Sequence, residues 1–173
     1  MTPMRISEIV LRTARYDELR AWYQAVLGID PYLDTDRFCF RRLHSDYPYT
    51  QLLVIFNRPE LQTEPRTGPG LDHMQFRCCS LGELLDRYER LKTAGIVPHR
   101  SMNHGPGMSF YYRDPDGNVV ELSSVNFKTE DEYLAYVASE KFRSNISGIA
   151  VNPDELVAQY RNGVLGEDLV RIP

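Results

Sequence analysis

The chain has 173 residues, and its 24 acidic and 20 basic side chains give a formal net charge of −4. An apolar fraction of 42% with 25% charged residues is typical of a globular protein and excludes a disordered chain. The slight acidity argues against nucleic-acid binding, and no apolar run is long enough to cross a bilayer. No secretory signal is visible and three irregularly placed cysteines form no disulfide framework, so we expect a cytoplasmic protein.

The first sixty residues predict a strand, a helix and three further strands. Residues 5–12 alternate apolar and polar side chains, as a half-buried strand does. Residues 16–27 carry apolar side chains at helical spacing, and Gly28 predicts the end of that helix. Short β-prone runs follow at residues 31–33, 37–43 and 50–56.

The second half repeats this order of elements. A strand is predicted at residues 71–78, and Ser80 with Glu83 forms a capping-box pattern before a helix over residues 81–93. Glu8 aligns with His73 when the halves are superposed, which indicates an internal repeat of roughly sixty-five residues. The remaining strands are predicted at residues 96–100, 108–113 and 118–124, with an Asp-Pro-Asp-Gly turn between the last two.

These patterns predict an α+β fold with four parts. The first module is expected at residues 1–60 and the second at residues 71–126, joined by a Pro- and Gly-rich linker at 61–70. A C-terminal helical extension occupies residues 127–173, where two capping patterns predict two helices. These helices are expected to pack on the repeat or on a second subunit.

A histidine and two carboxylates are candidates for a metal site. Glu121 lies inside an apolar strand, where a carboxylate is costly unless it is paired, and His73 lies on a predicted strand. Because equivalent first strands of a two-fold repeat face each other, Glu8 is expected to meet both. Such ligands suit Fe(II), Mn(II), Zn(II) or Ni(II). The repeat partner of Glu121 falls in the apolar run 54–56, which leaves coordination positions open, as a catalytic metal needs.

Two further residues are candidates for proton transfer. His104 lies in a Gly-Pro-Gly loop before a strand, where an imidazole can act as acid or base near neutral pH. Tyr111 and Tyr112 point to opposite faces of that strand, and one shares the face of Glu121. A tyrosine there can donate a hydrogen bond to developing negative charge. The alternative is that His104 only caps a turn in its loop and that both tyrosines are packing residues, and we prefer the packing role for Tyr112.

Several segments carry a resemblance to a known family. They are GLDHMQFRC (70–78), the NHGPG loop (103–107), SFYYRDPDGNVVEL (109–122) and the opening ISEIVLRT (6–13) with WYQAVLG (22–28). Together they resemble the vicinal oxygen chelate superfamily of glyoxalases, bleomycin-resistance proteins and extradiol dioxygenases. Within it, the chain is most similar to single-chain proteins of the biphenyl-2,3-diol 1,2-dioxygenase or catechol 2,3-dioxygenase type.

The resemblance implies two tandem βαβββ modules that close into a cup-shaped mixed β-sheet barrel around a metal, commonly in a homodimer. Extradiol members use two histidines and one glutamate as ligands. The second histidine matches His73 and the glutamate matches Glu121, whereas Glu8 stands where the first strand usually carries a histidine. Tyr111 matches the acid/base tyrosine of the family, and His104 lies close to its loop histidine.

Three functions follow as hypotheses, because this fold hosts all of them. The first is an extradiol-type dioxygenase in which Fe(II) binds a catecholic or related small aromatic substrate and O2, His104 acts as base and Tyr111 assists proton transfer. The second is a glyoxalase-type lyase or isomerase that uses nickel, zinc or manganese, with Glu8 as ligand or base. The third is a non-catalytic small-molecule-binding protein with a degenerate metal site. None of them involves nucleic acid or a membrane.

Overall fold

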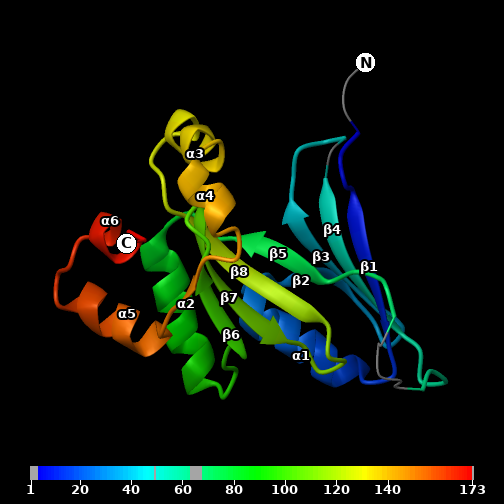
Figure 1. The fold of residues 1–173 in the computed structure, drawn as a ribbon. Coiled ribbons are helices and arrows are strands. Elements are labelled where there is room, and N and C mark those ends of the chain that lie inside the picture. Colours follow the sequence, from blue (N-terminus) through cyan, green and yellow to red (C-terminus); the bar gives the residue numbers. More distant parts are fainter. Residues whose placement is uncertain (1–3, 49, 63–67, 173) are drawn as a thin grey trace. The chain divides into compact units, whose positions relative to one another are not determined.

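A computed structural model describes residues 4–48, 50–62 and 68–172, so residues 63–67 of the predicted linker lie outside the described part. The chain divides into two compact units, each drawn in Figure 1. Unit 1 comprises Met1–Gly70 and Asp114–Asn118, and unit 2 comprises Leu71–Arg113 and Val119–Pro173. Among the described helices, none combines the length and the apolar character that crossing a membrane requires.

The described residues of unit 1 form one helix and one four-stranded sheet. Its elements are β1 (Glu8–Thr13), α1 (Tyr16–Leu27), β2 (Pro31–Asp34), β3 (Phe38–His44) and β4 (Gln51–Asn57). The strand order is β1-β4-β3-β2, with β1 parallel to β4 and the other neighbours antiparallel. As predicted, α1 ends at Gly28, whose φ of 66° is left-handed and whose N–H donates to the carbonyl of Gln24.

The predicted Asp-Pro-Asp-Gly turn carries a buried acid in unit 1. Asp114 is only 4% exposed, and its carboxylate accepts hydrogen bonds from the backbone N–H groups of Asp116 and Asn118. The hydroxyl of Tyr23, a fully buried residue of α1, donates to the Asp114 carboxylate at 3.1 Å. Burial raises the pKa of Asp114 above its ordinary 3.8, and these hydrogen bonds oppose that rise.

Replacing Tyr23 by phenylalanine is expected to lower the free energy of unfolding by about 1–3 kcal/mol, because a buried carboxylate loses a donor. The bond stabilises the ionised acid, so the difference from wild type is full above the Asp114 pKa and shrinks as the pH falls through it. Urea unfolding at several pH values measures this. Tyr32→Phe is the control, since Tyr32 is 51% exposed, and an equal loss in both variants contradicts the prediction.

Unit 2 repeats the same order and then adds an extension. The repeat comprises β5 (His73–Arg77), α2 (Leu81–Thr93), β6 (Arg100–Asn103), β7 (Gly107–Arg113) and β8 (Val119–Val125). The extension comprises α3 (Glu130–Val137), α4 (Glu140–Ser144), β9 (Ile149–Ala150), α5 (Pro153–Arg161) and α6 (Gly166–Leu169). The strand order is β5-β8-β7-β6-β9, so the α+β class and the two βαβββ sequences of elements are confirmed.

The strand register supports the repeat residue by residue. In the parallel pair of unit 1, Glu8 lies opposite Leu52, and in that of unit 2, His73 lies opposite Val119. Glu8 and His73 therefore occupy equivalent positions. Two residues further along each ladder, Val54 of β4 is equivalent to Glu121 of β8.

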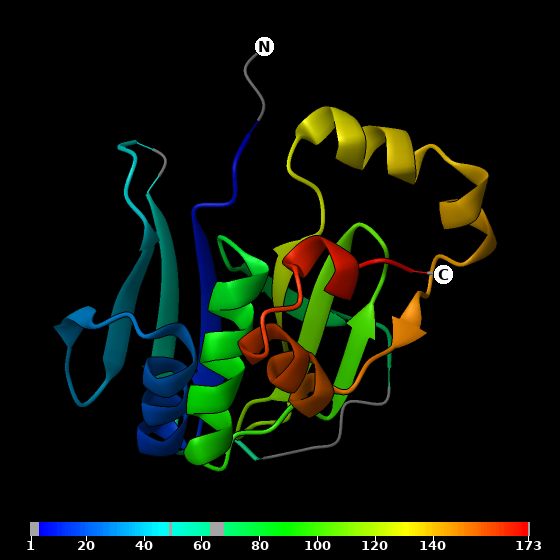
Figure 2. The same cartoon turned by 90° about the vertical axis from the view of Figure 1, so that its left-hand side faces the viewer.

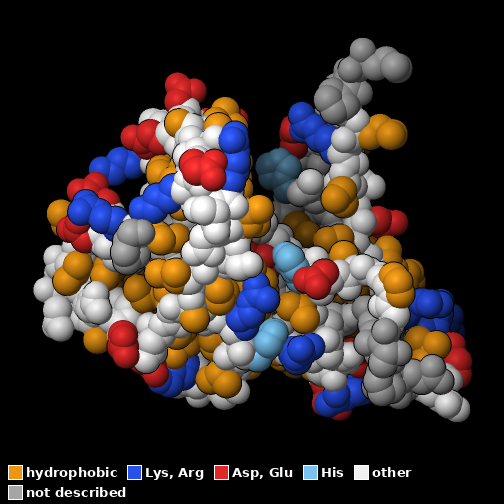
Figure 3. All heavy atoms as spheres, in the orientation of Figure 1, with side chains coloured by type: hydrophobic (Ala, Val, Ile, Leu, Met, Phe, Trp, Pro, Cys, Tyr) orange, Lys and Arg blue, Asp and Glu red, His pale blue; other side chains and the backbone are white. Residues whose placement is uncertain are grey.

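Two predictions need correction. The strand expected at residues 96–100 is wrong: β6 begins at Arg100, since Pro98 has no N–H to donate to a ladder. Residues 127–172 of the extension, which the structure describes, form four helices instead of two, and β9 adds to the edge of the sheet beside β6. Figure 2 shows α5 against α2, a contact that covers part of this helix. On the face in Figure 3, acidic and basic side chains are intermixed over the extension, as on a solvated surface.

Candidate metal and catalytic site

The sheet of unit 2 has one face toward α2 and one face that carries polar groups. On the helix side, the rings of Phe110 and Tyr88 lie 5.6 Å apart. The register places Gln75, Glu121 and Tyr111 side by side on three neighbouring strands, on the opposite face. Tyr112 points to the helix side, and no described residue bonds its buried hydroxyl, in agreement with a packing role.

His73 and Glu121 form the centre of the polar face. The imidazole Nε2 of His73 lies 2.8 Å from Oε2 of Glu121, whose side chain is 4% exposed. On the other edge of the ring, Nδ1 lies 2.6 Å from Oδ1 of Asp72. The hydrogen bond to His73 lowers the pKa of Asp72. A carboxylate on Nδ1 fixes the ring and leaves Nε2 as the nitrogen that can bind a metal.

The second carboxylate oxygen of Glu121 is held by neighbouring strands. Its Oε1 accepts hydrogen bonds from Nε2 of Gln75 at 2.8 Å and from the hydroxyl of Ser109 at 2.6 Å. Gln75 also donates to the hydroxyl of Ser123 at 3.0 Å. These bonds fix the rotamer of Glu121 and leave its Oε2 directed at His73. The two side chains therefore present a carboxylate oxygen and an imidazole nitrogen side by side, and both atoms can bind a metal.

Tyr111 and His104 form a second polar pair in the same unit. The Nε2 atom of His104 lies 2.9 Å from the Tyr111 hydroxyl, and the guanidinium of Arg100 lies 4.5 Å from the Tyr111 ring centre. Burial raises the pKa of Tyr111, and the nearby charge of Glu121 raises it further. The phenol therefore stays protonated at neutral pH and can act as a donor.

A pocket of about 170 Å³ opens beside these groups. Glu121, Ser109 and His104 line it, together with Arg77 of β5 and Tyr133 of α3. One member of each candidate pair, Glu121 on the sheet and His104 on a loop, therefore lines the pocket, together with the first helix of the extension.

Of the residues predicted from the sequence, the structure joins His73 to Glu121 and His104 to Tyr111. Glu8 lies at the start of β1 in unit 1, where it is exposed. Across the described part of the chain, no group of three or more His, Cys, Asp and Glu side chains gathers as metal ligands. Sequence reasoning missed Asp72 and Gln75. Their positions in the sequence could have indicated them: Asp72 directly precedes His73, and Gln75 lies two residues after His73, on the same face of the strand.

His73 and Glu121 fit as two ligands of a divalent transition metal. Their facing atoms are an imidazole nitrogen and a carboxylate oxygen, a set that suits Fe(II), Mn(II), Ni(II) or Zn(II). A carboxylate bound to the remote ring nitrogen is the usual support of a metal-bound histidine.

Two curated proteins from Rhodococcus globerulus are similar to this chain. Biphenyl-2,3-diol 1,2-dioxygenase 2 is 36% identical over 151 residues, which cover 86% of this chain and 77% of that protein. Biphenyl-2,3-diol 1,2-dioxygenase 3 is 34% identical over 171 residues, which cover 98% and 88%.

Solved structures share the fold at lower identity. A glyoxylase/bleomycin resistance protein/dioxygenase domain from Frankia sp. EAN1pec matches with a TM-score of 0.61 and 22% identity, over 76% of this chain and 99% of that one. Lactoylglutathione lyase from Agrobacterium tumefaciens matches with a TM-score of 0.56 and 22% identity, over 72% and 96%. The family model that matches residues 5–122 covers most of both modules. The chain therefore belongs to the Glyoxalase/Bleomycin resistance protein/Dioxygenase superfamily.

Proposed function

We propose that this chain is an extradiol-type dioxygenase that opens the ring of a catecholic or related aromatic small molecule with O2. The observation that carries the proposal is the pair of His73 and Glu121, held at 2.8 Å and supported by Asp72 on the far ring nitrogen. The names of the two Rhodococcus relatives favour this chemistry over the other reactions of the superfamily.

In this proposal, Glu8, His73 and Glu121 are the residues that would hold Fe(II). When bound, Fe(II) supplies a redox-active centre at which a diol and O2 can be brought together. The overall reaction breaks one ring C–C bond beside the diol and places both oxygen atoms of O2 in the product, so no external reductant is needed. His73 and Glu121 are kept in place for this by Asp72 and Gln75.

The chain's own residues would handle the protons. His104 is the base that takes a proton from a diol hydroxyl, because its imidazole lines the pocket beside Glu121. Tyr111 remains protonated and donates to His104 or to negative charge that develops on the substrate. The 2.9 Å contact between the two groups gives a proton a direct route from one to the other.

The direct test is an aerobic assay of protein purified without chelator and supplied with Fe(II). Catechol and 2,3-dihydroxybiphenyl are expected to give a yellow ring-opened product. A colourless mixture with both diols, from a folded protein that holds iron, would overturn the proposal. Gel filtration of the same sample tests the predicted homodimer.

The carboxylate at position 8 favours a second candidate function, that of a metal-dependent lyase or isomerase of the glyoxalase type. The register places this carboxylate at the position equivalent to His73. A second carboxylate makes the ligand set more anionic and supplies a base for moving a proton. Metal analysis separates the candidates: iron supports the dioxygenase, nickel, zinc or manganese supports the lyase or isomerase, and no metal supports a binding protein.

Tyr111→Phe is expected to lower kcat for ring cleavage by about 10²-fold with little change in KM, since general acid–base groups contribute 10²–10⁴-fold. Tyr112→Phe is a matched control on the same strand, because the Tyr112 hydroxyl has no partner among the described residues. Steady-state kinetics of both variants measure the effect. Equal kcat values in the two would remove Tyr111 from the mechanism.

A further inference from the structure

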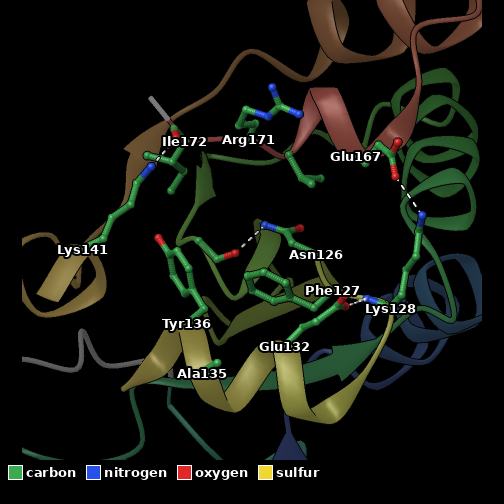
Figure 4. A pocket seen from close by; sticks show the side chains of 12 residues that line it. Asn126, Phe127, Lys128, Glu132, Ala135, Tyr136, Lys141, Glu167, Arg171 and Ile172 are labelled. Atoms are coloured by element: carbon green, nitrogen blue, oxygen red, sulfur yellow. Dashed lines mark hydrogen bonds and ion pairs between the residues drawn. The ribbon is translucent and has the colours of Figure 1, made fainter. Parts of the chain in front are cut away.

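A second and larger pocket lies within unit 2, among the elements that follow β8 (Figure 4). Its volume of about 550 Å³ falls in the range of pockets that bind small molecules. It shares no lining residue with the pocket beside Glu121. A loop separates the two: His104 and Pro106 line the smaller pocket, and Gly105 lines the larger.

Two aromatic rings form one wall of this large pocket. Phe127 and Tyr136 lie 5.2 Å apart between ring centres, and in Figure 4 both project toward the middle of the pocket. Ala135 on α3 and Val170 and Ile172 after α6 add apolar surface. A flat aromatic ligand would cover these rings and gain the stacking energy of such pairs.

The charged side chains that line the pocket differ in how far their hydrogen-bonding groups are already used. Lys128 pairs with Glu167 at 2.8 Å, and Glu132 is occupied by the cap of α3, where it accepts from the Thr129 N–H. Lys141 donates to the carbonyl of Ile172 at 2.7 Å, and this bond uses one of three ammonium protons. The lining therefore retains a cation with free donor capacity.

Arg171 adds a second cation on the same rim. Its guanidinium lies 3.3 Å from Asp168 with a side chain that is 74% exposed, so this ion pair is weak. In Figure 4, Lys141 reaches the segment that carries Ile172 and Arg171, across the pocket from Phe127. One rim is thus basic, and the opposite wall is aromatic.

One side-chain amide in the pocket wall has an oxygen that accepts no hydrogen bond from a described residue. Asn126 donates through Nδ2 to the carbonyl of Gly105 and to Oδ1 of Asn103, both at 2.9 Å. Its own Oδ1 is buried, and no described residue donates to it. A buried acceptor without a donor is costly, so a hydrogen-bond donor inside the pocket, such as a water molecule, would stabilise this oxygen, whereas a carboxylate, which only accepts, belongs at the basic rim.

We propose that this pocket is a binding site for a small aromatic carboxylate, separate from the site of His73 and Glu121. The ring would lie against Phe127 and Tyr136, and the carboxylate would accept hydrogen bonds from Lys141 and Arg171. The proposal does not depend on the ring-cleavage function, because it uses none of the residues assigned to that function.

Calorimetric titration with 2-naphthoate, and with its uncharged analogue 2-naphthamide, tests this site. We expect one naphthoate per chain with a dissociation constant of ~10 µM to 1 mM, and about tenfold weaker binding of the amide. Lys141→Met should weaken naphthoate about tenfold, as expected for a charge-assisted hydrogen bond. Arg37→Met removes the same charge from an exposed residue outside the lining and should leave binding unchanged.

A pocket-filling variant makes the result decisive. Ala135 is exposed on α3, so Ala135→Trp can fill the pocket without disturbing a core. Loss of naphthoate binding in this variant, with an unchanged circular dichroism spectrum, supports the site. Binding that persists in Ala135→Trp, or no binding by the wild type, overturns the proposal. A change of oligomeric state in Ala135→Trp without naphthoate binding by the wild type also overturns it, since the pocket would then be an interface between copies.

Discussion

Glu121→Gln is expected to lower both Fe(II) affinity and ring cleavage by more than about 10²-fold. Loss of a residue that merely supports a ligand costs about 10–100-fold, so loss of an anionic ligand costs more. The fold should survive. The new amide oxygen can still accept from Gln75 and Ser109, while its NH2 group replaces the oxygen that faces His73.

Metal binding and activity are measured separately for this variant. Iron content after dialysis reports the first, and the initial rate with 2,3-dihydroxybiphenyl reports the second. Glu60→Gln is the matched control, because it makes the same atom change on an exposed carboxylate. If Glu121→Gln keeps wild-type iron content, then Glu121 is only a buried hydrogen-bond acceptor and the proposed ligand set is wrong.

The helices of both modules could be predicted because their signals are local. The boundaries of α2 match the expectation, since Ser80 caps it through the Glu83 N–H and the apolar spacing fixes its buried face. The strand β6 could not be placed this way. The run that begins at Ile96 is β-prone, but Pro98 has no backbone N–H to donate to a neighbouring strand. The pairing with β7 therefore begins only at Arg100.

The polar face of the sheet in unit 2 could be predicted in part, because the alternation of side chains along a strand is also a local signal. A two-residue period places Tyr111 and Tyr112 on opposite faces, and an acid within an apolar strand marks Glu121. The support of Asp72 under His73 depends on side-chain orientation, which no sequence period encodes. The large pocket arises from packing among three helical segments of the extension, so neither its walls nor its basic rim could be foreseen.

Glu8 is the one proposed ligand that belongs to unit 1, so its substitution tests whether residues of both modules bind the metal. Glu8→Ala should reduce Fe(II) affinity and ring cleavage by more than about 10²-fold, by the same reasoning as for Glu121. The side chain is exposed within its unit, so its removal should leave the stability of the metal-free protein within about 0.5 kcal/mol of wild type.

A thermal shift separates metal binding from catalysis for Glu8. Any ligand that binds only the folded state raises the melting temperature by mass action, so added Fe(II) under anaerobic conditions should stabilise wild type and leave Glu8→Ala unchanged. Glu8→His places a neutral nitrogen ligand where the carboxylate stood and should retain both the shift and the activity. Glu60→Ala is expected to behave as wild type. If Glu8→Ala shows the full shift and the full rate, Glu8 is an exposed residue at the start of β1 and takes no part in the site. If activity falls while the shift persists, Glu8 acts as a base, and the glyoxalase-type reaction becomes the better account.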